Sequence, residues 1–302
     1  MVSPRCQVAG RSRAIQADID GVDHQGVKLL CWNLGFAAGR WRKEPSLHER
    51  AWHWIAAVDP DLAFLQETEP PDWARERWEV LMLPHHFWAS AIVTRRGSPL
   101  LPTALPAGGV IERAGSYHAT AELDLVGGER LLAASVHTSP HEAPPWGHRG
   151  YRRKAIARSS VGKPWWNDVA FAGYRDLVAG RRFLLAGDWN TSRWLDKNGV
   201  PEPDGQEFFD RAAAAGWVEL SLDAEGREGK TWYGSTNPRF CQLDHVFADA
   251  TTAELLRSFR IDPYPVEAHG LSDHAPMILE LDLEVATREG LPASALEIAA
   301  AQ

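Results

Sequence analysis

The sequence predicts a layered α/β protein whose sheets are mainly antiparallel. Three observations support this prediction: many short apolar runs of strand length, few helical patterns, and no internal repeat or low-complexity linker dividing the chain. The 302 residues fit one large layered domain or two average ones. A hydrophobic fraction of 44% and a charged fraction of 24% are those of an ordinary globular protein that can bury a substantial core.

The first predicted elements are a strand, a helix and a second strand. Residues 27–32 form a continuous apolar run of strand length that ends at Asn33. Residues 47–58 place apolar side chains at helical spacing, and Asp59-Pro60-Asp61 then ends the helix. Residues 62–65 form the next apolar run.

The middle of the chain predicts a strand and a hairpin. Residues 89–93 are an apolar run, and residues 117–125 and 130–136 are strand-like segments joined by Gly127-Gly128. A long polar segment follows over residues 139–164, and loops of this length are often functional.

The last part of the chain predicts one more helix and four strands. A helical pattern covers residues 166–178, and residues 183–186 form an apolar run. The remaining predicted strands are residues 242–247, 255–261 and 276–283.

Composition also predicts the boundaries of the domain and its compartment. We expect residues 27–285 to form one domain, residues 1–26 a poorly ordered extension, and residues 286–302 a C-terminal tail. The extension has arginines but no apolar run behind them, which argues against a secretory signal, and no stretch is apolar enough to span a membrane. The three cysteines show neither a disulfide framework nor metal-ligand spacing, so we expect a reducing, cytoplasmic location.

Polar side chains stand at the ends of the predicted strands, where core residues would be expected. The set consists of Asn33, Glu67, His137, Asp188, Asn190, Asp244, Asp273 and His274. If the strand ends meet at one edge of the sheets, these groups converge on one site. A carboxylate such as Glu67 with Asn33 or Asp273 suits Mg²⁺, Mn²⁺ or Ca²⁺, which favour oxygen ligands, and the sequence has no zinc-type Cys or His spacing.

Such a set suits attack on a phosphate ester. A metal ion neutralises phosphoryl charge, a general base activates water, and a donor or cation stabilises the five-coordinate species. A histidine oriented by a carboxylate is the natural base near neutral pH. His245 adjoins Asp244, but strand alternation sends its side chain to the opposite face, so packing is its expected role.

Six short motifs occur in a fixed order along the chain. They are Trp32-Asn33, Leu65-Gln66-Glu67, Ser135-Val136-His137, Gly187-Asp188-Trp189-Asn190, Leu243-Asp244-His245 and Ser272-Asp273-His274-Ala275-Pro276. Each motif alone occurs by chance, but all six in this order resemble the endonuclease/exonuclease/phosphatase superfamily, which has the deoxyribonuclease-I-like fold. The resemblance covers residues 27–283. It implies an α/β (α+β) fold, a four-layer sandwich of two packed, mainly antiparallel β-sheets flanked by helices, with the site at one rim.

The resemblance also implies roles for the site residues. Glu67 would be the principal ligand of Mg²⁺ or Mn²⁺, with Asn33 and Asp273 supporting the metal directly or through water. Asp188 and Asn190 would orient the attacking water and the phosphate.

The two histidines of the set receive different roles from the resemblance. Asp244 would accept a hydrogen bond from His274, and this pair would act as the base or stabilise charge. His137 resembles the second histidine of the family, which contacts the scissile phosphate and can protonate the leaving group. Family members often pair that histidine with an acid before the third strand, where this chain has His85-His86-Phe87-Trp88. Either another acid such as Glu112 substitutes, or His137 works without a partner.

A basic segment with interleaved aromatic residues follows His137. Its candidate substrate-binding residues are Arg149, Arg152, Arg153 and Lys154. Such a mixture suits contact with a phosphate backbone and stacked bases, and the alternative is an ordinary solvated loop. The formal net charge of −8 gives no global attraction to nucleic acid.

We therefore expect a divalent-metal-dependent enzyme that hydrolyses a phosphodiester by in-line attack of water, with a nuclease as the first candidate. The substrate partner would be a phosphate ester, with nucleic acid the leading example. The same scaffold serves sphingomyelinases, inositol-polyphosphate phosphatases and nucleotide-processing enzymes, which the motifs do not separate. A catalytically inactive binding module is the alternative of another class, and the joint retention of the carboxylates and histidines argues against it.

Overall fold

The computed structural model describes residues 26–35, 44, 46–82, 89–98, 103–104, 117–125, 128–139, 165–193, 203–234 and 241–283. The expected extension before residue 26 and the expected tail lie outside the described residues. The predicted domain boundaries therefore stay predictions.

One sheet has six strands in the order β11-β12-β1-β2-β4-β3. The strands are β1 (Val27–Asn33), β2 (Leu62–Thr68), β3 (Trp78–Met82), β4 (Ala89–Arg95), β11 (Leu256–Ile261) and β12 (Met277–Leu281). β1 and β2 are parallel and are connected by helix α2 (Ser46–Val58), because a parallel pair needs a crossover connection. All other neighbours in this sheet are antiparallel.

The second sheet has the order β5-β6-β7-β8-β10-β9. The strands are β5 (Thr103–Ala104), β6 (His118–Asp124), β7 (Arg130–His137), β8 (Arg182–Asp188), β9 (Val218–Glu219) and β10 (Asp244–Ala248). Here β7 and β8 are the parallel pair, with helix α5 (Trp166–Val178) between them in sequence. The remaining pairs are antiparallel, so both sheets are mainly antiparallel as predicted.

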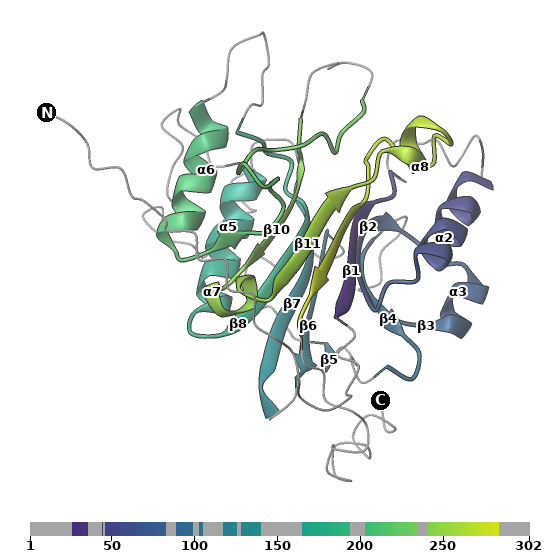
Figure 1. Cartoon of the computed structure of the whole chain (residues 1–302), viewed down its shortest axis with the longest axis horizontal. Coiled ribbons are helices and arrows are strands. Elements are labelled where there is room, and N and C mark those ends of the chain that lie inside the picture. The colour runs from purple at the N-terminus through teal and green to yellow at the C-terminus, as the bar shows by residue number, and fades with distance from the viewer. Residues whose placement is uncertain are drawn as a thin grey trace, which may run out of the picture.

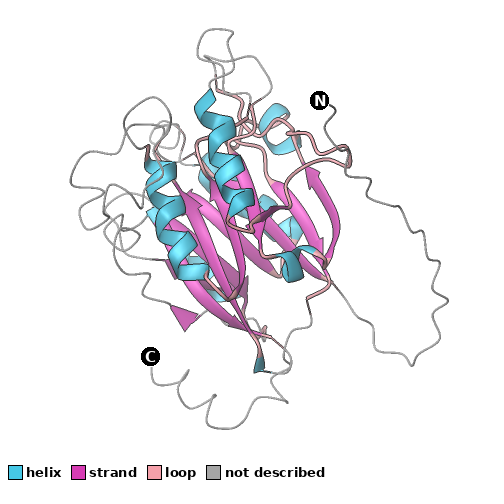
Figure 2. Ribbon diagram, turned by 90° about the vertical axis from the view of Figure 1, so that its left-hand side faces the viewer, coloured by secondary structure: helices cyan, strands magenta, loops and turns pink. Residues whose placement is uncertain are grey.

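The two sheets pack face to face between two helical layers. Figure 1 shows α2 and α3 (Asp72–Arg77) on one side of the strands, and α5 and α6 (Pro203–Ala214) on the other. In Figure 2 two long helices lie over the near face of the strands. Two short helices, α7 (Ala250–Ala253) and α8 (Tyr264–Glu267), complete the described part of the chain. The predicted four-layer sandwich is confirmed.

Strand alternation in β1 shows how the sequence builds these layers. Leu29 and Cys31 belong to the core between the two sheets, whereas Leu30 and Trp32 belong to the core under α2 and α3. All four side chains are fully buried, which explains why β1 reads as a continuous apolar run rather than an alternating one. A third core joins the outer face of the second sheet to α5 and α6 around the fully buried Trp189.

Strand pairing places the predicted polar residues at one edge of the sandwich, called the rim below. Within the first sheet Asn33 pairs with Gln66 at the carboxyl ends of β1 and β2. Within the second sheet His137 pairs with Asp188 at the carboxyl ends of β7 and β8, and Asp188 also faces Asp244 at the start of β10. The two parallel pairs are therefore what bring separated motifs to a common edge.

The helices and strands predicted from the sequence are present, but the structure also contains several helices and strands that were not predicted. The helical patterns at residues 47–58 and 166–178 correspond to α2 and α5, and the predicted strands to β1, β2, β4, β6, β7, β8, β10, β11 and β12. The elements not predicted are α3, β3, α6, α7, α8, β5 and β9. α6 carried an available signal, since Pro203 opens it and Gly216, with φ 82°, lies just beyond its end. None of the described helices is long and apolar enough to cross a membrane.

Candidate active site

Asn33 bridges the two sheets at the rim. Its amide Nδ2 donates to Asp188 Oδ2 at 2.9 Å and to Glu67 Oε1 at 3.4 Å. Its Oδ1 accepts from Gly35 N at 2.9 Å, which fixes the orientation of the amide. Asn33, Glu67 and Asp188 are all buried, with exposed fractions of 1%, 9% and 2%. Two carboxylates from different sheets, Glu67 and Asp188, are therefore held by one amide in a water-poor environment.

Two of the site residues have a left-handed backbone conformation. Glu67 has φ 49°, at the point where the register between β2 and β4 shifts, and Asn190 has φ 47°. This conformation is uncommon for residues other than glycine and costs roughly 1–3 kcal/mol, so surrounding contacts must hold it. Both residues lie where strand regularity ends, and the irregularity turns their side chains into the site.

The segment from Asp188 to Asn190 forms a tight loop after β8. Asn190 N donates to Asp188 Oδ1 at 2.9 Å, and Asn190 Nδ2 donates to Thr138 O at 2.5 Å. Gly187 before the loop has φ 151°, and a Cβ there would lie 1.8 Å from Val136 O. Only glycine lets β8 run so close to β7, and this closeness aligns Asp188 with His137.

Asp244 and His274 form a buried hydrogen-bonded pair, as the resemblance implied. His274 Nδ1 lies 2.8 Å from Asp244 Oδ2, and the residues are 6% and 1% exposed. Ser272 Oγ donates to Asn33 O at 2.7 Å and accepts from His274 N at 3.0 Å, which ties the loop before β12 to the end of β1. On the other side, Thr231 Oγ1 accepts from Asp244 N at 3.3 Å.

The electrostatics of this pair favour a charged histidine. Burial alone would lower the pKa of His274, but the carboxylates of Asp244 and Asp188 outweigh it and raise the pKa to about 10. Burial would raise the pKa of Asp244, but the charge of His274 and its hydrogen bond lower it below the ordinary value. At neutral pH the pair is therefore an imidazolium and a carboxylate.

The pKa of Asp188 is raised, in contrast to that of Asp244. Burial raises its pKa from 3.8 to about 6, with neighbouring Asp244 adding to the rise and His274 opposing it. Its Oδ2 lies 3.9 Å from His274 Nε2 and 3.8 Å from His137 Nε2. Asp188 thus lies between the two histidines, with a pKa close to that required of a general base near neutral pH.

His137 lies beside carboxylates that sequence reasoning did not assign to it. Its Nε2 is 3.4 Å from Glu67 Oε1, and its ring centroid is 5.5 Å from that of Tyr117. Residues 85–88, where family members carry the acidic partner, and Glu112, the alternative partner, lie outside the described residues. Among the described residues, Glu67 and Asp188 are the carboxylates that lie within ion-pair distance of His137.

Three hydroxyl residues support the site and were not predicted. Thr138 Oγ1 donates to Trp189 O at 2.6 Å, Thr231 Oγ1 accepts from Leu243 N at 3.0 Å, and Ser272 joins β1 to the last loop. Ser272 begins the motif Ser272-Asp273-His274-Ala275-Pro276, so of the three it could have been identified from the sequence. The other two were not identifiable, because threonine next to a strand is common in any sheet protein.

The remaining predicted site residues are less closely placed. Asp273 is half-buried, and a Cβ at Gly35 would lie 2.8 Å from Asp273 Oδ1, so its carboxylate packs against the Gly35 backbone. The candidate substrate-binding residues lie outside the described residues, and they are Arg149, Arg152, Arg153 and Lys154. Their roles stay predictions.

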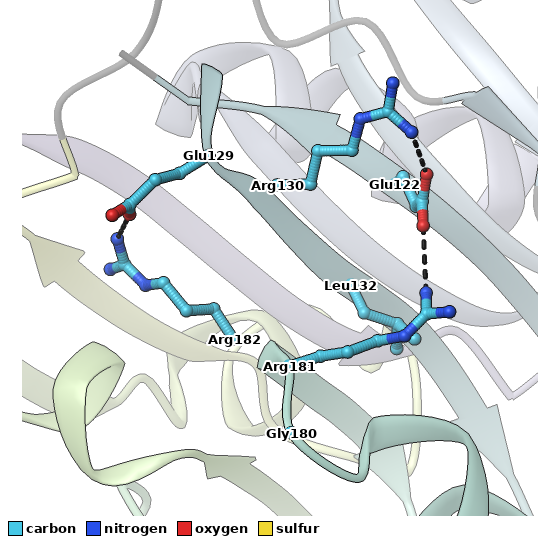
Figure 3. Close-up of a pocket in the computed structure, with 7 residues that line it drawn as sticks. All are labelled: Glu122, Glu129, Arg130, Leu132, Gly180, Arg181 and Arg182. Carbon is cyan, nitrogen blue, oxygen red and sulfur yellow. Dashed lines mark hydrogen bonds and ion pairs between the residues drawn. The ribbon is translucent and has the colours of Figure 1, made fainter. Parts of the chain in front are cut away.

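A cavity of about 400 Å³ lies at the other end of β7 and β8, away from the rim. Figure 3 shows Glu122 between Arg130 and Arg181, and Glu129 beside Arg182. The nitrogen–oxygen distances of these three ion pairs are 2.9, 2.9 and 2.6 Å. Each arginine is thus paired with a carboxylate, although Arg130 and Arg181 share Glu122, and the predicted site residues lie at the rim instead.

The order of the motifs and the geometry of the rim agree with a comparison of whole sequences. Residues 30–274 match the endonuclease/exonuclease/phosphatase family. The chain belongs to this family. No curated protein sequence gives a significant match to it.

Solved structures show the fold of this endonuclease/exonuclease/phosphatase protein in distant relatives. An AP endonuclease from Archaeoglobus fulgidus has a TM-score of 0.59 and 14% identity, covering 85% of this chain and 99% of that chain. A 3′ phosphatase from Neisseria bound to a product DNA hairpin has a TM-score of 0.57 and 18% identity, covering 84% and 99%. An AP endonuclease from Leishmania major has a TM-score of 0.58 and 14% identity, covering 85% and 88%.

The donor set at the rim of this family member fits a divalent cation. Asp188, Asp244 and His274 each place one oxygen or nitrogen atom within 4.8 Å of the others, and Asn33 links Asp188 to Glu67. With His274 protonated, the carboxylates are the donors in this set. Asp244 Oδ1 is buried and has no hydrogen-bond partner among the described residues. Burial leaves the charge of Asp188 incompletely balanced, as its raised pKa indicates. A cation bound here would offset the charge, and hard oxygen donors favour Mg²⁺ or Mn²⁺.

Proposed function

We propose that the protein is a divalent-metal-dependent phosphodiesterase, and that its substrate is a nucleic acid. The observation that carries the proposal is the buried Asp244–His274 pair, which faces Asp188 beside Glu67 and Asn33 at one rim. A binding module has no use for a buried imidazolium aimed at a second carboxylate. Burial of such charges costs several kcal/mol, so a function must retain them.

Glu67 would hold the metal, with Asp188 and Asp273 as further oxygen donors directly or through water. Asn33 was expected to be a ligand, but its Oδ1 accepts from Gly35 N and its Nδ2 faces the carboxylates, so it would position Glu67 and Asp188. When bound, Mg²⁺ or Mn²⁺ supplies positive charge that neutralises the phosphoryl oxygens and favours nucleophilic attack. The expected metal ligands, Glu67, Asn33 and Asp273, share no residue with the tightest cluster, which is Asp188, Asp244 and His274. Asn33 links the two sets, because its Nδ2 contacts both Glu67 and Asp188. We therefore assign metal binding first to Glu67 and Asp188, the carboxylates that contact Asn33.

The proton handling is proposed from the positions and charges of the site residues. Asp188 would orient the attacking water and accept its proton, because its buried carboxylate lies 3.9 Å from His274 Nε2 and 3.8 Å from His137 Nε2. Asn190, fixed by Thr138 O, would hold the phosphate or the water. His274 would stabilise the charge that develops on the phosphoryl oxygens, since its raised pKa keeps it cationic. Of the two roles left open for this histidine, charge stabilisation is the one its environment favours.

His137 would act on the leaving group. His137 is the last residue of β7, which borders Asp188 of β8 on the side away from Asp244. Its ring also lies near Glu67 of β2. An imidazole at that place can bind the scissile phosphate and donate a proton to the departing oxygen. Breaking one phosphorus–oxygen bond and forming another then gives a phosphate monoester and an alcohol.

Nucleic acid is the proposed substrate for two reasons. Structural neighbours include a phosphatase bound to a DNA hairpin and two AP endonucleases, although their low identity shows shared fold alone. The basic segment with Arg149, Arg152, Arg153 and Lys154 lies in the stretch of sequence that follows β7, and β7 ends at the rim. Its cations suit phosphate-backbone contact.

We also propose a cytoplasmic location, supported by the unpaired Cys31 and Cys241.

A substrate panel tests the proposal. Purified protein with Mg²⁺ should be assayed on single- and double-stranded DNA, RNA, sphingomyelin, inositol phosphates and dinucleotides. We expect hydrolysis of a polynucleotide, and replacing Arg152, Arg153 and Lys154 together by Ala should raise KM for it while sparing a small phosphodiester. Arg130→Ala, at the far end of β7, is the matched control and should leave KM unchanged. Cleavage of a lipid or inositol phosphate alone would overturn the nuclease assignment.

A further inference from the structure

A second group of charged side chains lies buried on the other side of β10 from the catalytic pair. This charged cluster consists of Arg193, Glu219, Glu228 and His245. The side chain of His245 is 0% exposed, those of Glu219 and Glu228 are 6% and 3% exposed, and that of Arg193 is 22% exposed. His245 points away from Asp244 as predicted, but its contacts go beyond packing against Phe209.

His245 has four hydrogen-bond contacts, two at each ring nitrogen. Its Nδ1 lies 2.7 Å from Glu219 Oε1 and 3.3 Å from Gln242 Nε2, and its Nε2 lies 2.9 Å from the backbone oxygen of Thr191 and 3.1 Å from that of Gln242. The shorter contact of each nitrogen is to an oxygen that can only accept, which fits a ring with hydrogen on both nitrogens. Thr191 directly follows Asn190, so the ring holds the backbone one residue beyond the catalytic loop.

The next two residues are held by the same cluster. Ser192 Oγ donates to Glu228 Oε2 at 2.5 Å, and Arg193 N donates to Glu228 Oε1 at 3.0 Å. The Arg193 guanidinium pairs with Glu219 at 2.6 Å and with Glu228 at 3.1 Å. Three consecutive residues after Asn190 are therefore each tied to the cluster.

Stability alone does not account for this arrangement. A buried ionic cluster is a weak source of stability, since apolar residues of similar volume are often as good or better. It does impose one geometry on the chain it binds. Asn190 has a left-handed φ of 47°, which asparagine tolerates better than most residues, and the contacts of the next three residues fix the turn in which it lies.

We propose that His245, oriented by Glu219, is a positioning residue that fixes the Asp188–Asn190 loop through the backbone oxygen of Thr191. The inference rests on the proposed function, in which Asp188 and Asn190 handle the water and the phosphate. His245 contacts the loop through the backbone oxygen of Thr191, so we expect its loss to act mainly on kcat, through the placement of Asp188. A misplaced catalytic group of this kind typically costs about 10- to 100-fold in rate.

The test compares substitutions in the full chain with a matched buried ion pair elsewhere. His245→Leu removes all the hydrogen bonds of the ring, whereas His245→Gln keeps an N–H able to reach Thr191 O. The control is Arg211→Met, which breaks the Arg211–Asp168 pair between α6 and α5 and changes no residue of the loop or of the charged cluster. Kinetics on bis-(p-nitrophenyl) phosphate with Mg²⁺, melting temperature and hydrogen exchange of residues 188–193 are measured for each.

We expect His245→Leu to lower kcat about 10- to 100-fold with KM within twofold, and to speed hydrogen exchange in residues 188–193. His245→Gln should recover most of the kcat, and Arg211→Met should lower the melting temperature without either loop effect. If His245→Leu does not fold, Glu219→Gln replaces it and should show a smaller fall in kcat. Unchanged kcat and loop exchange in a folded His245 variant would overturn the inference. Wild-type protein without hydrolysis would overturn the proposed function, while hydrogen exchange would still test the positioning of the loop.

Discussion

Replacing Asp188 by Asn should stabilise the protein while abolishing its activity. The carboxylate is 2% exposed and its pKa is raised from 3.8 to about 6, first of all by burial. A raised carboxyl pKa means that the associated stability is present below pH 3.8 and lost as the pH rises through about 6. At pH 7.5, without a divalent cation, folding therefore works against an ionised Asp188.

The magnitude follows from the same structure. A pKa raised from 3.8 to about 6 corresponds to about 3 kcal/mol of destabilisation at pH 7.5. The amide that replaces it cannot accept as well from Asn33 Nδ2, now at 2.9 Å from Asp188 Oδ2, and this loss costs about 1 kcal/mol. The net gain is about 2 kcal/mol, or about 4 °C in melting temperature for a chain of this length.

Thermal unfolding in EDTA at pH 7.5 measures this effect, with Asp168→Asn as the matched control. Asp168 is also a buried carboxylate, but it is paired with Arg211, so the same substitution there should lower the melting temperature. Adding Mg²⁺ should stabilise the wild type more than Asp188→Asn, because the cation offsets the charge that the variant lacks. A lower melting temperature for Asp188→Asn in EDTA would refute the reasoning.

Three further outcomes follow from the site. Gly187→Ala should destabilise the protein by about 3 kcal/mol or more in urea unfolding, because the new Cβ would lie 1.8 Å from Val136 O; an unchanged midpoint would contradict the close approach of β7 and β8. Glu67→Gln should lower the apparent affinity for Mg²⁺ at least about 10-fold, as measured by the Mg²⁺-induced rise in melting temperature. A titration identical to that of the wild type would exclude Glu67 from the metal set. In EDTA, NMR titration should place the pKa of His274 near 10, and Asp244→Asn should lower this pKa. The stability linked to the raised pKa is present below pH 6.5 and is lost as the pH rises through about 10. A wild-type His274 that titrates near 6.5 would contradict the charged pair.

The parts of the fold that were predictable from sequence are those with a strong local pattern. β1, β2 and β8 are buried on both faces, so they read as uninterrupted apolar runs, and α2 and α5 carry apolar residues at helical spacing. β3 was not found because its residues are mostly half-buried and follow α3 directly, with no turn residue to mark the change. β5 and β9 are two residues long, too short for any periodic signal.

The site divides in the same way. Asn33, Asp188 and His274 could be identified because polar residues at the ends of apolar strands are conspicuous and their motifs occur in order. Pairing partners could not, because Asp188 opposite His137 and Asp244 depends on strand order in the second sheet. The charged state of His274 depends on two carboxylates from different strands, and no local pattern contains that information.

His245 shows where local reasoning is incomplete even when it is right. Strand alternation correctly turned its side chain away from Asp244. Its partner Glu219 comes from β9, 26 residues earlier in the chain, and Thr191 comes from the end of another strand. Only tertiary structure brings these groups together, and they turn an expected packing residue into a candidate positioning residue.

The central claim is that the rim catalyses metal-dependent hydrolysis of a phosphodiester. Release of p-nitrophenol from bis-(p-nitrophenyl) phosphate tests it most directly, measured with Mg²⁺ and with EDTA for the wild type and His274→Ala. The account predicts hydrolysis that requires the metal ion and falls at least about 100-fold in His274→Ala. Hydrolysis that persists in EDTA, or that is equal in the folded His274→Ala variant, would contradict it.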